Sequence, residues 1–95
     1  DFTFSFTYWA MGRFEESIRI GEIAHRQAAT HAGVLRMLIA SEVGLGHLER
    51  ARAYGRDLLR ISPDFRISRM EEIIPWQPAL IPRFSEALRS AGLPE

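Results

Sequence analysis

The 95-residue chain contains no cysteine, no lysine and no asparagine. Without cysteine it has no thiol nucleophile, no disulfide and no zinc–thiolate site. Without lysine it has neither a Schiff-base lysine nor the lysine of a phosphate-binding loop. The absence of thiols also fits a reducing compartment, and we expect a cytoplasmic protein.

The chain also lacks an excess of either charge. Its 12 basic residues are all arginine, and 12 acidic residues bring the formal net charge to zero. Surfaces for duplex DNA or anionic membranes need excess positive charge, so we expect neither a nucleic-acid nor a membrane partner. No apolar run approaches the ~20 residues of a membrane span, since Arg36 interrupts the best candidate, residues 34–40. The composition is that of one small globular domain.

Motifs for catalysis are missing as well. His25, His31 and His47 are isolated, and no two have the spacing of a zinc site on a helix. No Gly-x-Ser-x-Gly motif occurs, and no nucleophile–base pair emerges from the sequence. We therefore expect no catalytic residue, no cofactor and no metal, and the fragment is not expected to be an enzyme.

What the chain does contain is a weak internal repeat. Apolar and small residues recur at spacings of three and four after Gly12 and on both sides of Gly46, and the repeat register extends this to two helices per unit joined by a tight turn. Glycines in the middle of the second helices predict close approach of two helix backbones. The identical pairs in the repeat are Gly12 and Gly46, Glu15 and Glu49, Gly21 and Gly55, and Arg26 and Arg60.

The last third of the chain departs from the repeat. An apolar stripe over 67–74 ends at Pro75, and a second stripe runs from Leu80 to Ala91. Pro82 suits a helix start, and Gly92 followed by Pro94 suits a helix end. We expect an all-α chain of about six helices with a capping helix at the C-terminus. It divides into unit one at 1–31, truncated at its start, unit two at 32–65, and a modified third hairpin with the cap at 66–95.

The N-terminal segment is ambiguous by pattern. The alternation of Phe2, Phe4 and Phe6 is typical of a strand, whereas the register of the repeat predicts a helix, which we favour.

The repeat period of about 34 residues, the helix–turn–helix unit and the segment 9–18 (WAMGRFEESI) resemble the tetratricopeptide repeat. Ala51 and Pro63 match positions that this family favours. The segment 88–95 (LRSAGLPE) is similar to the end of repeat regions that follow bacterial adenylate/guanylate cyclase or winged-helix regulator domains. This resemblance implies a non-catalytic protein–protein interaction module, the C-terminal part of a larger bacterial signalling protein whose upstream part is a nucleotide cyclase or a winged-helix transcription regulator.

In the repeat family, the first helices of the units line a groove that binds peptides. The positions implied here are Phe2, Phe6, Trp9, Arg36, Met37, Ala40, Val43 and Met70. Three interpretations of the aromatic positions remain open. They line a groove for a protein or peptide, they were covered by a preceding repeat, or they mediate self-association as a homodimer.

A row of arginines at every fourth position offers a second candidate surface. Arg52, Arg56 and Arg60 share one face of the second helix of unit two. They are suited to an anion or an acidic partner. Interspersed acidic residues favour an ordinary solvated face instead.

Overall fold

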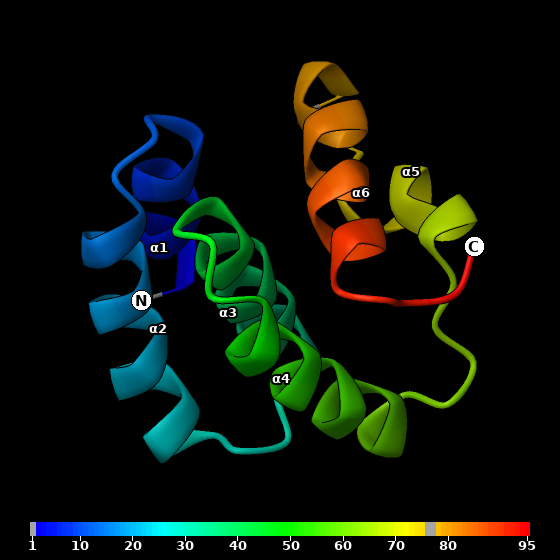
Figure 1. Ribbon diagram of the computed structural model, residues 1–95, viewed down its shortest axis with the longest axis horizontal. Helices are drawn as coiled ribbons and strands as arrows, with labels where there is room; N and C mark the ends of the chain where they lie inside the picture. The colour runs from blue at the N-terminus through cyan, green and yellow to red at the C-terminus, as the bar shows by residue number, and fades with distance from the viewer. Residues whose placement is uncertain (1, 76–77) are drawn as a thin grey trace.

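The computed structural model describes the backbone of residues 2–75 and 78–95 and the side chains of 5–75 and 78–95. Within these ranges it contains helices and no strand, as predicted, and residues 2–10 are helical (Figure 1). The six α-helices are α1 (Phe2–Ala10), α2 (Phe14–Gln27), α3 (Ala32–Gly44), α4 (Leu48–Ile61), α5 (Met70–Ile73) and α6 (Ile81–Ser90). Short 3-10 helices, η1 (Ile67–Arg69) and η2 (Pro78–Leu80), precede α5 and α6.

Helices α1 to α4 form two successive antiparallel hairpins (Figure 1). The shift along the chain that places Gly12 on Gly46 also places the start of α2 on the start of α4 and the end of α2 on the end of α4. Gly12 and Gly46 close the turns with φ of 80° and 81°, which L-residues with side chains rarely adopt. Backbone bonds around each glycine, such as His47 N–H to the carbonyl of Glu42 at 2.8 Å, form the glycine-closed helix end called a Schellman motif.

The same glycine ending closes α6. Gly92 has a φ of 86°, and the amide of Leu93 donates to the carbonyl of Leu88 at 3.3 Å. Both leucines are buried. The chain end then runs beside η1, where Ile67 and Ser68 donate backbone hydrogen bonds to the carbonyls of Pro94 and Glu95. This end of α6 is therefore tied to the start of the third hairpin.

The mid-helix glycines differ from each other in their surroundings. A methyl group on Gly21 would lie 2.9 Å from Cδ2 of the fully buried Leu38 on α3, which is too close. A methyl group on Gly55 would lie 3.5 Å from Cδ2 of Leu93, an ordinary contact. The predicted close approach of two helix backbones is therefore wrong at both glycines, because the nearest atoms belong to side chains, although Gly21 is tightly packed against Leu38.

Three buried serines join the first three helices. The hydroxyl of Ser5 on α1 donates to the carbonyl of Ser17 on α2 at 2.9 Å, and the Ser17 hydroxyl donates to the carbonyl of Ser5 at 2.8 Å. Ser41 on α3 donates to Oγ of Ser17 at 2.8 Å. Each hydroxyl hydrogen thus has an acceptor, as buried polar groups require.

Helix α6 packs mainly on α3, and it reaches α1 through the side chains of Phe84 and Arg83. Its apolar side chains Phe84 and Leu88 join the main core, together with the buried Met70 of α5. The result is a rounded chain, with extents of 28 × 27 × 23 Å. No helix among the described residues has the length and apolar character needed to cross a bilayer.

The contrast between the two glycines is testable. We expect Gly55→Ala to raise the free energy of unfolding by up to about 1 kcal/mol, because alanine is the better helix former. We expect Gly21→Ala to lower it, because overpacking costs about 1–3 kcal/mol and outweighs that gain. Urea denaturation of both variants measures the difference, and equal stability would contradict the packing described at Gly21.

The serine network is also testable by one substitution. Ser17→Ala leaves the buried Ser41 hydroxyl without its acceptor, and we expect a loss of about 1–3 kcal/mol in the free energy of unfolding. The control is Ser90→Ala, because that exposed hydroxyl bonds only to the carbonyl of Glu86 in its own helix. Similar stability for both variants would show that the network contributes nothing.

Candidate functional site

The face formed by α1 and α3 is covered by α6. The ring of Phe84 stacks on Phe6 with centroids 6.1 Å apart, and it meets the edge of Trp9 at 5.0 Å. Phe6 and Trp9 also contact each other at 5.8 Å. Trp9 and Phe84 are each only 2% exposed. These three rings form the aromatic cluster that holds α6 on α1.

Arg83 reinforces the cluster from its rim. Its guanidinium donates hydrogen bonds to the carbonyls of Trp9 at 2.9 Å and Ala10 at 3.0 Å. These carbonyls belong to the last turn of α1, where cationic side chains are favourable. The same guanidinium lies 4.4 Å from the centroid of the Trp9 ring, in cation–π geometry. One α6 side chain thus satisfies the end of α1 and covers its tryptophan.

The predicted groove residues lie mostly beneath α6 or within the core, and not in an open groove. Met37, Ala40 and Met70 are buried, and Val43 and Arg36 are half-buried. Phe6 and Trp9 are buried under α6, a cover that none of the sequence interpretations anticipated. The side chain of Phe2 lies outside the described residues.

The sequence reasoning missed the two residues of α6 that make this contact. The apolar stripe predicted from Leu80 to Ala91 includes Phe84, and Arg83 precedes it in the sequence. A helical stripe predicts that Phe84 is buried, but it does not identify the surface that buries it. The Arg-Phe pair at 83–84 carries no signal beyond ordinary amphipathicity.

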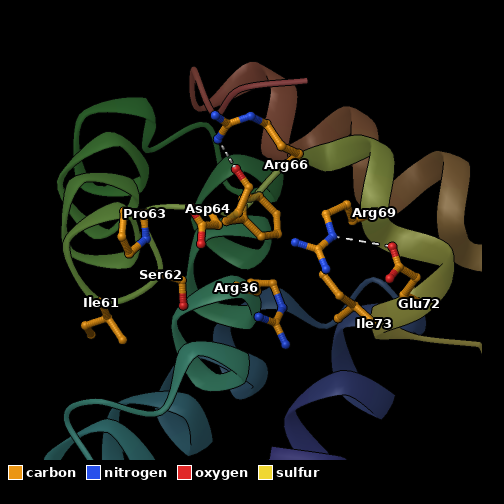
Figure 2. Close-up of a pocket in the computed structure, with 10 residues that line it drawn as sticks. Arg36, Ile61, Ser62, Pro63, Asp64, Arg66, Arg69, Glu72 and Ile73 are labelled. Atoms are coloured by element: carbon orange, nitrogen blue, oxygen red, sulfur yellow. Dashed lines mark hydrogen bonds and ion pairs between the residues drawn. The ribbon is translucent and has the colours of Figure 1, made fainter.

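A separate cavity of about 390 Å³ opens between α3, the end of α4 and the η1–α5 segment (Figure 2). Arg36 lines it from α3. On the opposite side, Arg66 lies just before η1, Arg69 belongs to η1 and Glu72 belongs to α5. Burial lowers the pKa of the Arg36 guanidinium. Of the seven predicted groove residues whose side chains the structure describes, only Arg36 lines this cavity.

The predicted arginine row stays on the surface. Arg52, Arg56 and Arg60 are all exposed on α4. Arg60 forms an ion pair with Asp57, so the row is partly neutralised. Exposed ion pairs of this kind contribute little to stability.

A buried carboxylate lies on the side of the chain between α2 and α4. Glu42 is 1% exposed and makes a 2.8 Å contact from Oε1 to Nδ1 of the exposed His47. Glu22, Arg50 and Tyr54 line the shallow hollow above it. Among the described residues, no group of three or more potential metal ligands comes together.

Comparison of the chain with family models, with curated proteins and with solved structures finds no match. The geometry of the α6 contact and of the arginine-lined cavity therefore carries the functional inference.

The aromatic cluster predicts a large effect of one truncation. Phe84→Ala removes a buried ring that touches both Phe6 and Trp9, and we expect a loss of about 3–5 kcal/mol in the free energy of unfolding. Met11→Ala is the control, since Met11 is 62% exposed and should change stability by less than about 0.5 kcal/mol. Urea denaturation gives both values, and a loss for Phe84→Ala no larger than that of the control would argue against the α6 contact.

Proposed function

We propose that this chain is a non-catalytic protein-interaction module of the tetratricopeptide type whose α1–α3 face binds an amphipathic helix. The observation that carries the proposal is α6 itself. It is an amphipathic helix, and it already lies on that face with Phe84 between Phe6 and Trp9. A surface that accepts a helix of its own chain has the chemistry to accept a similar helix from a partner.

The repeat geometry supports the family part of the proposal. A single shift along the chain relates both the starts and the ends of α2 and α4. The residues before these helices, Arg13 and His47, have similar backbone angles, with φ, ψ of −92°, 72° and −86°, 65°. Two hairpins with a common period and common ends are typical of helical repeats, whose exposed faces commonly bind proteins.

Because α6 already occupies the α1–α3 face, a partner helix must compete with α6 for it. Because α6 is tethered, it has a high effective concentration on α1 and α3, and a partner helix must displace it. The partner chemistry is an aromatic side chain that enters beside Trp9, preceded by a guanidinium for the carbonyls of Trp9 and Ala10. The segment 88–95 is similar to the end of repeat regions that follow bacterial cyclase or regulator domains. Within this proposal, the module is therefore part of a signalling protein.

Self-association is the second candidate, and the same observation favours it. Helix α6 follows the second hairpin and packs on the first helix of each hairpin, so α6 of one copy fits the α1–α3 face of another without new contacts. Exchange of one element between identical chains is a common route to homodimers. This candidate replaces the dimer through an uncovered N-terminal helix, because α6 covers Phe6 and Trp9.

A peptide competition experiment tests the proposal. A fluorescent peptide of the segment 78–95 is titrated into the wild-type chain and into Arg83→Met and Phe84→Ala variants. We expect weak binding to the wild type and at least about tenfold tighter binding to both variants, because their own α6 competes less well. The matched control is a peptide that carries Phe84→Ala, which should bind to none of them.

The Arg83→Met variant keeps this test decisive if Phe84→Ala unfolds, since it leaves the aromatic cluster in place. Absence of peptide binding to a folded Arg83→Met chain would overturn the proposal that the face binds helices in trans. Light scattering of the wild type separates the two candidates. A monomer at all concentrations contradicts self-association, whereas a dimer that dissociates on adding the peptide supports exchange of α6.

A further inference from the structure

The cavity beside Arg36 holds an arginine whose charge has no partner. Arg36 is half-buried on α3, and burial alone lowers the pKa of its guanidinium. Within the described residues, no carboxylate or carbonyl accepts a hydrogen bond from it. The guanidinium is partly desolvated while its nitrogens still reach solvent, so its donors are accessible to an anion.

A second guanidinium is directed into the same space. Arg36 of α3 and Arg69 of η1 both line the cavity, and Figure 2 shows the Arg69 guanidinium directed into it. The Nε of Arg69 donates a long hydrogen bond of 3.4 Å to Glu72, which leaves its terminal N–H groups for another acceptor. Arg66 is directed elsewhere, because it donates to the carbonyl of Phe65 at 2.7 Å.

The other walls of the cavity are largely apolar, and its lining carries a small excess of positive charge. Ile61, Pro63 and Ile73 line the cavity beside the two guanidinium groups (Figure 2). Its charged lining consists of three arginines against Asp64 and Glu72, an excess of one positive charge. One negative charge on an apolar body matches this lining better than a doubly charged phosphate. The volume of about 390 Å³ is within the range of small-molecule sites.

We propose that this cavity is a binding site for an organic monocarboxylate. The carboxylate lies between the guanidinium groups of Arg36 and Arg69, and the aliphatic or aromatic body contacts Ile61, Pro63 and Ile73. Arginine suits this role because its planar fork donates two parallel hydrogen bonds to a carboxylate. The site is independent of the α6 contact and of the function proposed above.

Titration of the full chain with hexanoate, followed by calorimetry and by the arginine side-chain N–H signals in NMR, tests the site. We expect saturable binding of hexanoate, with shifts of the Arg36 and Arg69 signals, and no binding of hexanamide or inorganic phosphate. Arg36→Met should weaken hexanoate binding by at least about tenfold, since a hydrogen bond to a charged group is lost. Arg52→Met, which removes an exposed arginine of α4, should leave binding unchanged.

A measurement without ligand adds an independent check. Because the charge of Arg36 is unpaired and partly desolvated, Arg36→Met should fold and melt at or above the wild-type temperature. A lower melting temperature would show that Arg36 has a structural partner and would overturn the site. Equal binding of hexanamide, retained binding in Arg36→Met, or shifts that do not saturate would overturn it as well.

Peptide titrations distinguish whether the bound carboxylate belongs to a chain terminus or to a free small molecule. A tetrapeptide that ends in leucine is compared with its C-terminal amide. Tighter binding of the free-acid peptide than of hexanoate assigns the site to a chain terminus, and tighter binding of hexanoate assigns it to a free small molecule. Both results support the carboxylate site, whereas equal binding of peptide acid and amide contradicts it.

Discussion

The contact of Phe84 with Phe6 and Trp9 is the interaction on which the shape of the whole chain depends. Helices α1 to α4 are two hairpins connected in series, and such an array leaves one face of its first helices without a neighbour. The ring of Phe84 fills that face, and Arg83 binds the carbonyls at the end of α1. Without these contacts α6 would pack on α3 alone, and Trp9 would lose the ring that covers it.

Polar groups set the registry that makes this contact fit. Ser5, Ser17 and Ser41 join α1, α2 and α3 at three points where hydroxyl groups must meet to be satisfied. Apolar packing alone tolerates small shifts of one helix along another, whereas these hydrogen bonds do not. The backbone bonds from Ile67 and Ser68 to the C-terminal residues fix the other end of α6 in the same way.

Local features of the fold follow from the sequence, and distant ones do not. Gly12, Gly46 and Gly92 mark helix ends because only glycine adopts their positive φ without strain, so these ends were predictable. The spacing of apolar residues predicted the helices after Gly12, whereas the N-terminal helix was predicted by the register of the repeat, against the alternation of its phenylalanines. The surface that α6 covers was not predictable, because periodicity shows which face is buried and not what buries it. Arg36 and Arg69 belong to different elements, α3 and η1, and form no sequence motif, so their cavity emerges only from the fold.

The most direct measurement of the central claim is an isotope-filtered NOE experiment on a mixture of labelled and unlabelled wild-type chains. The account predicts strong NOEs between the ring protons of Phe84 and the indole of Trp9 within one labelled chain, since their centroids are 5.0 Å apart. Absence of these NOEs in the folded protein would contradict the position of α6. NOEs found only between labelled and unlabelled chains would contradict its packing within a single chain.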